Sequence, residues 1–247
     1  MPCACLSRRR FLSLGAAMPL VACDGPPDLV SEAEVERMGL QAWSEIRAAT
    51  PVTRDAGFED VLGAVSGRLI DAAGESAGDW EVVGFASDQV NAFVLPGRKI
   101  GVYEGLWRVA RGPDALAAVI GHEIGHLEAD HAQERMSAQK AGGIVQRIAR
   151  FALRTADIEY SDEIAAALGL GLTYGVLLPY SRRQELEADA LGLRHMARAG
   201  FDPAQAAEFW RRMDARASRG PAILATHPAP SDRIEAIEQM IPELRRL

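Results

Sequence analysis

The chain has 247 residues, of which 48% are hydrophobic, and this is enough material for one good-sized domain or two small ones. Its formal net charge is −7 and it contains no basic stripe, which argues against nucleic acid as a partner. The cysteines, Cys3, Cys5 and Cys23, all lie near the N-terminus, so the sequence beyond them can form no internal disulfide and no thiolate metal site. A metal in that part of the chain must be held by histidines and carboxylates.

The first residues predict an export signal. The segment Ser7–Leu12, reading SRRRFL, places three arginines at the start of a short apolar run, Phe11–Leu20. That run is too short to remain in a membrane as a permanent spanning helix, and a basic start followed by an apolar middle is typical of a secretory signal peptide. The S-R-R-x-F-L form resembles a twin-arginine signal, which exports proteins that are already folded.

The signal ends in Leu20-Val21-Ala22-Cys23, which resembles a bacterial lipobox. In a lipobox the cysteine receives lipid and becomes the mature N-terminus, so we expect residues 1–22 to be removed and residues 23–27 to form a lipidated tether. Asp24 resembles the signal that retains bacterial lipoproteins in the inner membrane. The prediction is a periplasmic protein held to a membrane by a lipid on Cys23. The alternatives are a plain signal peptide with an incidental cysteine and an uncleaved anchor.

Two amphipathic helices and three short strands are predicted next. Apolar residues at helical spacing, with Ser31 as a cap, indicate the first helix, and the same pattern recurs after Pro51. Runs of β-branched and aromatic residues indicate the strands, the last two joined by a Pro96-Gly97 turn. The expected helices are Leu29–Ala49 and Phe58–Ala73, and the expected strands are Trp80–Phe85, Val90–Leu95 and Ile100–Tyr103.

The helix predicted after Gly112-Pro113-Asp114 carries the pattern H-E-x-x-H, as His122, Glu123 and His126. On a helix, residues i and i+4 are about 40° apart, so the two imidazoles share one face and can hold one metal ion. Glu123 lies at the edge of that face, where its carboxylate can reach a water on the metal. The pattern therefore predicts a zinc site with Glu123 as the catalytic base, rather than a helix that carries two histidines by chance.

A strand that precedes this helix offers a way to hold a substrate. In zinc peptidases an edge strand beside the metal binds the substrate backbone as an added strand. Asn91, Ala92 and Phe93, in the second predicted strand, are the candidates for substrate binding. The alternative is an ordinary strand of the sheet.

The segment Ile164–Tyr180 carries no charge over seventeen residues. Its length allows a membrane span, but its glycines, Gly169, Gly171 and Gly175, lower its apolarity and suit close packing, so a buried helix is favoured. It leads directly into a polar segment that begins at Ser181.

A third metal ligand is predicted in that polar segment, which reads SRRQELEAD. Glu185 and Asp189 are i and i+4, so they share a helix face. A catalytic zinc site needs three protein ligands and a water, and Glu185 would complete a set of two histidines and one glutamate. Asp189, one turn later, is placed to accept the free ring N–H of a ligating histidine. The alternative is a solvent-facing acidic pair.

Four segments, in this order, resemble a large gluzincin metallopeptidase family. They are NAFVLPGRKIGVYEGL, GHEIGHLEADH, LLPYSRRQELEADALGL and THPAPSDRI, and the resemblance extends from Val82 to Ile237. The family contains the CAAX prenyl endopeptidase, the HtpX heat-shock protease and BepA-type periplasmic proteases. The resemblance implies zinc ligands at His122, His126 and Glu185, a catalytic Glu123 and a supporting Asp189.

The chain departs from some members of that family. It lacks the multi-span pattern of the membrane-embedded members, and it shows no repeat period like that of the C-terminal helical domain of BepA-type members. We expect residues 28–247 to form a single zinc metallopeptidase domain. The expected fold is α+β and mainly α-helical, a zincin-type core with a small β-sheet whose edge strand lies beside the H-E-x-x-H helix.

The resemblance makes a more specific prediction for His227, because the T-H-P loop of BepA-like proteases lies near the metal. The resemblance implies either a reversible plug in the open zinc position or a hydrogen-bond donor to the oxyanion formed during cleavage, and the plug is favoured. The remaining alternative is a loop histidine remote from the zinc. His131 and His195 match no ligand motif and are interpreted as ordinary helix histidines.

The leading functional hypothesis is a periplasmic endopeptidase with one Zn²⁺ per chain, and misfolded or misassembled envelope proteins as substrates. A second hypothesis is a chaperone-like module that binds unfolded envelope proteins through the edge strand and cleaves little. A third is a zinc enzyme that trims small peptides from one end. The complete ligand set and Glu123 argue against the second hypothesis.

Overall fold

The computed structural model describes residues 29–141, 143, 182–228 and 231–246. The leader with Cys23 and Asp24, and the uncharged run Ile164–Tyr180, lie outside the described residues, so the predictions for them stay predictions. The helices are α1 (Glu32–Ala49), α2 (Ala56–Ala72), α3 (Glu104–Ala110), α4 (Pro113–Glu128), α7 (Arg182–Arg198), α8 (Ala204–Asp214), α9 (Ala222–Thr226) and α10 (Ser231–Leu244). The strands are β1 (Glu81–Phe85), β2 (Ala92–Leu95) and β3 (Lys99–Tyr103). Residues 131–141 are also helical, and two short 3-10 turns cover Ala77–Asp79 and Ala217–Arg219.

The described part of the chain is mainly helical with one small sheet, which confirms the predicted α+β class. The N-terminal helix begins where its cap was expected, because the Ser31 side chain accepts a hydrogen bond from the Glu34 N–H at 3.3 Å. The second helix begins two residues earlier than predicted, where the Asp55 carboxylate caps the Phe58 N–H at 3.1 Å.

The three strands form one sheet in the order β1-β3-β2. Strand β1 is parallel to β3, and β2 is antiparallel to β3, with Ala92 opposite Val102 and Leu95 opposite Lys99. The turn between β2 and β3 uses left-handed backbone at Gly97, with φ 86°, as the Pro96-Gly97 pair predicted. Strand β2 therefore lies at an edge of the sheet.

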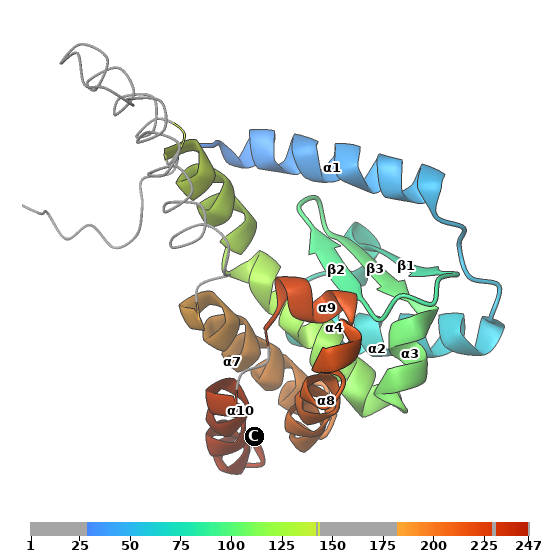
Figure 1. Ribbon diagram of the computed structural model, residues 1–247, viewed down its shortest axis with the longest axis vertical. Helices are drawn as coiled ribbons and strands as arrows, with labels where there is room; N and C mark the ends of the chain where they lie inside the picture. The colour runs from blue at the N-terminus through green and yellow to red at the C-terminus, as the bar shows by residue number, and fades with distance from the viewer. Residues whose placement is uncertain (1–28, 142, 144–181, 229–230, 247) are drawn as a thin grey trace, which may run out of the picture.

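Different helices cover the two faces of the sheet (Figure 1). On one face, Ile100 packs with Phe58 of α2 and Leu116 of α4 in the main hydrophobic core. On the other face, Trp43 of α1 meets Phe85 with 5.9 Å between the ring centroids. The H-E-x-x-H helix α4 thus lies buried between the sheet and the C-terminal helices.

Helices α4 and α7 cross where small residues allow their backbones to touch. A Cβ atom at Gly125 would lie 2.6 Å from the carbonyl oxygen of Ala188, and one at Gly192 would lie 2.6 Å from the carbonyl carbon of Gly121. Both distances are below the 3.0 Å that real Cβ contacts respect, so only glycine fits at these positions. The close crossing sets the face of α7 that carries Glu185 against the face of α4 that carries His122 and His126.

Helices α8 and α10 pack beside α4 and α7 (Figure 1). Trp210 of α8 and Ile237 of α10 are buried in the main core. Helix α10 also carries a buried charge, Arg233, which is 1% exposed. Among the described residues, no helix has the length and apolar character needed to cross a membrane.

Candidate metal centre

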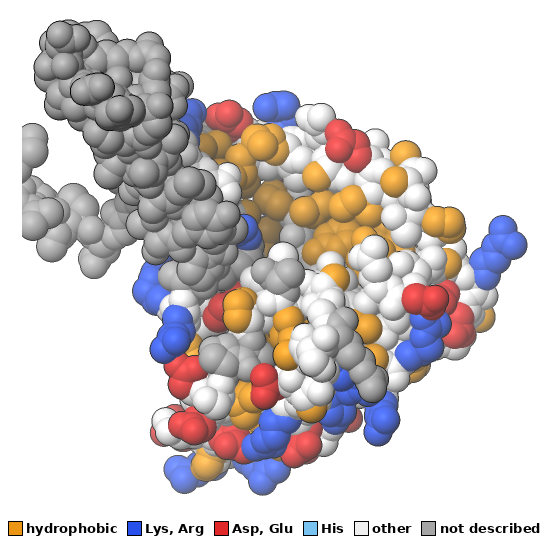
Figure 2. Space-filling model, in the orientation of Figure 1, with side chains coloured by type: hydrophobic (Ala, Val, Ile, Leu, Met, Phe, Trp, Pro, Cys, Tyr) orange, Lys and Arg blue, Asp and Glu red, His pale blue; other side chains and the backbone are white. Residues whose placement is uncertain are grey.

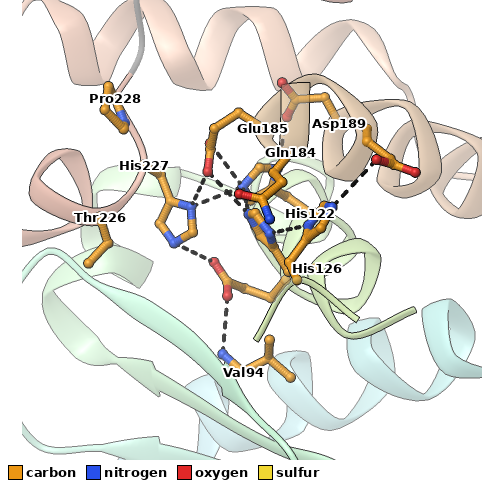
Figure 3. Close-up of polar contacts among 12 residues, drawn as sticks. Val94, His122, His126, Gln184, Glu185, Asp189, Thr226, His227 and Pro228 are labelled. Carbon is orange, nitrogen blue, oxygen red and sulfur yellow. Dashed lines mark hydrogen bonds and ion pairs between the residues drawn. The ribbon is translucent and has the colours of Figure 1, made fainter. Parts of the chain in front are cut away.

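The H-E-x-x-H residues lie on a buried face of α4. His122, Glu123 and His126 are 2%, 2% and 4% exposed. The ring centroids of the two histidines are 4.5 Å apart, and their Nε2 atoms are 3.0 Å apart. The i, i+4 spacing therefore places both imidazoles on one face of the helix, as predicted, with their Nε2 atoms directed toward each other (Figure 3).

Glu185 of α7 and His227, which follows α9, complete a cluster of four possible metal ligands (Figure 3). One donor atom from each of His122, His126, Glu185 and His227 lies within 4.8 Å of the others. Glu185 Oε1 is 3.3 Å from His126 Nε2 and 3.1 Å from His227 Nδ1. The structure thus brings the three predicted ligands together and places His227 beside them.

The donor atoms of this cluster fit a bound cation. His122 Nδ1 lies 2.9 Å from Asp189 Oδ1, so this nitrogen carries a proton and donates it to the carboxylate. His122 Nε2 faces His126 Nε2 at 3.0 Å and His227 Nδ1 at 3.2 Å. Ring nitrogens that converge in a buried space repel one another unless a proton or a metal ion lies between them, and imidazoles with a carboxylate are a common donor set for metals.

The charges around the cluster favour a cation there. Burial lowers the pKa of His122, as does Arg233, but the carboxylates of Asp189 and Glu185 raise this pKa more, to about 9. Burial and the charge of His122 lower the pKa of His126 to about 3, so this ring stays in the neutral form that binds metals. Burial raises the pKa of Glu185, but His122 and hydrogen bonds from the histidines lower it far below its ordinary value. The carboxylate of Glu185 is therefore ionised.

Asp189 and Arg233 support the ligands from behind. Arg233 donates to both oxygens of Asp189, from Nε at 2.6 Å and from Nη2 at 2.8 Å. Arg233 Nη1 lies 2.6 Å from Glu185 Oε2 and donates to the Pro228 carbonyl at 2.9 Å. One guanidinium thus ties α10 to two acids of α7 and to the loop after α9. Asp189 has the supporting position that the sequence predicted for it.

Sequence reasoning did not single out Arg233, although the residue lies in the quoted THPAPSDRI segment. A signal was present. Arg233 precedes Ile237 by four residues and Leu244 by eleven, so it falls on the apolar stripe of an amphipathic helix. A charge on such a stripe is buried and requires a buried partner of opposite sign.

Glu123 connects the cluster to the sheet. Its Oε2 accepts a hydrogen bond from the Val94 N–H of β2 at 3.1 Å, and its Oε1 lies 3.4 Å from His227 Nε2 (Figure 3). The edge strand therefore lies directly beside the predicted base, as expected from the sequence.

The sequence profile described as peptidase family M48 matches residues 59–241, a stretch that contains all four members of the cluster. The chain belongs to peptidase family M48. This result confirms the gluzincin resemblance, and it places the candidate cluster inside the matched part of the chain.

Curated relatives of this M48 chain include proteins from mitochondria and from bacteria. The mitochondrial metalloendopeptidase OMA1 of Schizosaccharomyces pombe is 38% identical over 179 residues, which cover 71% of this chain and 51% of that protein. The β-barrel assembly-enhancing protease of Escherichia coli K12 is 25% identical over 248 residues, which cover 95% of this chain and 51% of that protein. The mitochondrial metalloendopeptidase OMA1 of Bos taurus is 31% identical over 234 residues, which cover 89% of this chain and 43% of that protein. The chain thus spans about half the length of the curated relatives it matches.

In this M48 chain, the three residues predicted to bind substrate do not all direct their backbone groups to the open edge of the sheet. The Asn91 carbonyl accepts from the Tyr103 N–H at 3.2 Å, and hydrogen-bonded pairs alternate along an antiparallel ladder, so Asn91 and Phe93 direct their backbone groups to β3. Ala92 and Val94 direct theirs away from β3. The Phe93 ring packs on Trp43 of α1, on the face of the sheet away from the main core. Of the three candidates, Ala92 alone has an outward backbone.

Hydrogen bonds at both ends position the His227 loop. The Ile223 N–H of α9 donates to the Val90 carbonyl at 3.1 Å, just before β2, and the His227 N–H donates back to the Ile223 carbonyl at 2.8 Å. The Pro228 carbonyl accepts from Arg233. His227 is 4% exposed, so the histidine is held inside the site rather than in a remote loop.

A cavity of about 460 Å³ lies beside the metal centre. Its walls come from the start of α1, the β2–β3 turn and the end of α4, and they include the ring of His126. Apolar side chains gather in a hollow below α1 on the face shown in Figure 2. The M48 core thus has open space beside His126, one of the candidate ligands.

Proposed function

We propose that this M48 chain is a zinc-dependent endopeptidase that cleaves misfolded or misassembled proteins of the cell envelope. The observation that carries the proposal is the position of the Glu123 carboxylate, 3.4 Å from His227 Nε2 in the metal-binding cluster and 3.1 Å from the backbone nitrogen of Val94. A base in that position lies between the metal site and a strand edge that can hold an extended peptide. The names of the relatives, metalloendopeptidase and protease, support the same class of reaction.

Zinc is the metal that this donor set favours. Two histidines and one glutamate form an established ligand set for catalytic zinc, with one position left for water or substrate. We assign His122, His126 and Glu185 as the three ligands and expect one Zn²⁺ per chain. When bound, zinc would polarise the scissile carbonyl and lower the pKa of its water to near neutrality.

Glu123 is the residue that we expect to move the proton. Its Oε1 atom is buried and accepts no hydrogen bond from the described residues, with His227 Nε2 3.4 Å away, so a lone pair is available to accept a proton from water. Glu123 then carries this proton to the amine that leaves when the peptide bond breaks. The Val94 N–H holds the other oxygen and keeps the carboxylate aimed at the cluster.

The outward edge of β2 is the proposed place of the substrate backbone. Ala92 and Val94 are the residues whose backbone groups point away from β3, and the Val94 N–H already reaches Glu123. An extended chain added at this edge would lie against the base and the ligands. Binding through backbone groups suits a peptidase that acts on unfolded segments of many sequences.

His227 is the proposed plug of the metal site. Its Nδ1 atom lies 3.2 Å from His122 Nε2 and 3.1 Å from Glu185 Oε1, which makes the ring a fourth possible ligand beside the three assigned ones. A fourth protein ligand would occupy the position that the substrate carbonyl needs. The plug is reversible, because the ring belongs to a loop rather than to the ligand helices.

The location and substrates rest on the leader and on the names of the relatives. A signal of twin-arginine form, a lipobox ending in Cys23 and the Asp24 that follows it support a periplasmic protein anchored by lipid, with the inner membrane favoured. The Escherichia coli relative is named a β-barrel assembly-enhancing protease, and this name supports envelope proteins as substrates. We also propose that residues 28–247 form a single domain.

The test uses the full chain in detergent with an unfolded protein as substrate. Glu123→Gln should retain the zinc and the fold, while the cleavage rate falls by about 100-fold or more, because the general base is lost. Glu128→Gln, on the same helix and outside the cluster, is the matched control and should cleave normally. Internal fragments that disappear with a chelator would support an endopeptidase. Trimming from one end would favour the small-peptide enzyme, and binding without cleavage would favour the chaperone-like module.

A further inference from the structure

The two histidines of the H-E-x-x-H motif are supported from behind by different groups. His122 Nδ1 donates to a carboxylate, Asp189, at 2.9 Å. His126 Nδ1 instead lies 2.8 Å from Nδ1 of another histidine, His131, whose ring centroid is 4.9 Å away. His131 is 1% exposed and is not a member of the four-residue cluster. A metal-binding histidine needs a partner for its second nitrogen, and here the partner of His126 is an imidazole.

A break in the helix creates this contact. Residues five apart on a continuous helix are separated by about 140°, so His126 and His131 would face different directions. Helix α4 ends at Glu128, and Asp130 adopts left-handed backbone with φ 52° before the next helical segment starts at 131. Such backbone is uncommon outside glycine and is often retained where it serves a site. Here it turns the His131 ring back onto His126.

The contact admits one arrangement of protons that is compatible with metal binding. Two Nδ1 atoms 2.8 Å apart share a single hydrogen, so one ring donates and the other accepts. If His131 donated, neutral His126 would carry its own proton on Nε2 and could not bind a metal through that atom. If His126 donates, its Nε2 lone pair faces His122 and Glu185, where the cluster lies.

Glu187 selects the second arrangement. Its Oε2 lies 3.5 Å from His131 Nε2, which is buried and makes no hydrogen bond to the described residues, so the contact is a charge interaction rather than a formed hydrogen bond. Arg183 holds the Glu187 carboxylate with a hydrogen bond of 3.2 Å. A carboxylate beside Nε2 favours the tautomer of His131 that carries its proton on Nε2. Neutral His131 then has a bare Nδ1, which accepts the hydrogen from His126.

We propose that His131 is a positioning residue that accepts the Nδ1–H of His126 and thereby holds His126 Nε2 as a metal ligand, with Glu187 fixing the tautomer of His131. The inference rests on the proposed function, because it assigns His126 to the metal. It gives the buried His131, which matches no ligand motif in the sequence, a role in the strength of metal binding.

The first test measures zinc affinity by competition with a chelator, using the full chain in detergent. His131→Leu removes the acceptor and should weaken zinc binding by about 10- to 100-fold, the usual cost of losing a partner of a ligating histidine. His131→Asn keeps an oxygen where Nδ1 was and should stay within about threefold of the original chain. The matched control is His195→Leu, which removes another buried helix histidine, one that contacts Glu128 instead of the cluster, and should not change the affinity.

The results separate the possible failures. A His131→Leu chain that binds zinc within about threefold of the original, or an Asn variant as weak as the Leu variant, would overturn the positioning role. An equal loss in His195→Leu would assign the effect to general packing. If the original chain bound no zinc, the proposed function itself would fall.

A second measurement needs no substitution and so does not depend on the folding of a variant. Nitrogen NMR of the zinc-loaded chain with ¹⁵N-labelled histidine reports which ring nitrogen carries the proton. The expected spectrum has protonated Nδ1 on His126, and on His131 a bare Nδ1 with protonated Nε2. A proton on His131 Nδ1 would refute the proposal.

Discussion

Removal of the buried charge of Arg233 should destabilise the fold more than any surface substitution. In Arg233→Met the side chain keeps much of its volume but loses the guanidinium that pairs with Asp189 and Glu185, both about as buried as Arg233 itself. Breaking a buried ion pair by removing one partner costs about 3–5 kcal/mol, because the remaining charge is left without compensation. For a chain of this size that loss lowers the melting temperature by roughly 6–20 °C. The stacking of Arg233 on Trp210, 3.9 Å from the guanidinium carbon to the ring centroid, adds to the cost.

The assay is urea unfolding of the metal-free chain, followed by circular dichroism in the presence of a chelator. Arg211→Met is the matched control, because Arg211 is 42% exposed and pairs with Glu208 and Glu238 on the surface. Exposed pairs of this kind contribute about 0–1 kcal/mol, so the control should unfold almost as the original chain does.

A double-mutant cycle with Asp189→Asn identifies the partner. If Arg233 neutralises Asp189, the double variant should lose less stability than the sum of the two single variants, with a coupling of roughly 0.5–3 kcal/mol. Loss of less than about 1 kcal/mol in Arg233→Met, or strict additivity in the cycle, would refute the reasoning, since either result means that the buried charges do not depend on one another.

Three other substitutions test the metal centre and the anchor. Glu185→Ala should strongly weaken zinc binding in a chelator competition, and full zinc occupancy in this variant would remove Glu185 from the ligand set. His227→Ala should speed cleavage of an unfolded protein if His227 is a plug. A fall in kcat of about 100-fold with unchanged zinc content would instead identify His227 as an oxyanion donor. An unchanged rate would show that His227 is neither a plug nor an oxyanion donor. Cys23→Ser should abolish lipid attachment and release the protein from membranes in an alkaline wash. A membrane fraction that stays unchanged would indicate that Ile164–Tyr180 is the anchor.

The local parts of the site could be predicted from the sequence because they depend on spacing along a single element. His122 and His126 share a face of α4 because a helix repeats every 3.6 residues, and no other part of the fold is needed for that result. Strand β2 could be recognised from its β-branched and aromatic residues, and the start of α1 from the Ser31 cap. The four motifs in their order also sufficed for the family, which the match over residues 59–241 confirms.

The register of the sheet decided which residues of the edge strand β2 direct their backbone groups toward a substrate. Sequence reasoning placed the substrate-binding residues at Asn91, Ala92 and Phe93, because a strand can be recognised without knowing which of its backbone groups its neighbour uses. The pairing with β3 leaves Ala92 and Val94 facing outward, and Val94 is the residue that reaches Glu123. A shift of one residue in the register would have exchanged the two sets, so only the assembled sheet could settle the choice.

Contacts between distant elements decided which side chains join or support the two histidines of α4. Glu185 reaches the histidines because Gly125 and Gly192 allow α4 and α7 to touch, and a pattern within either helix does not reveal that crossing. Arg233 reaches Asp189 from a third helix, and His131 returns to His126 because the backbone turns at Asp130. Each of these contacts joins side chains whose separation along the chain is unrelated to their separation in space. The sequence by itself therefore determined which groups could bind a metal, and the tertiary packing decided which groups orient them.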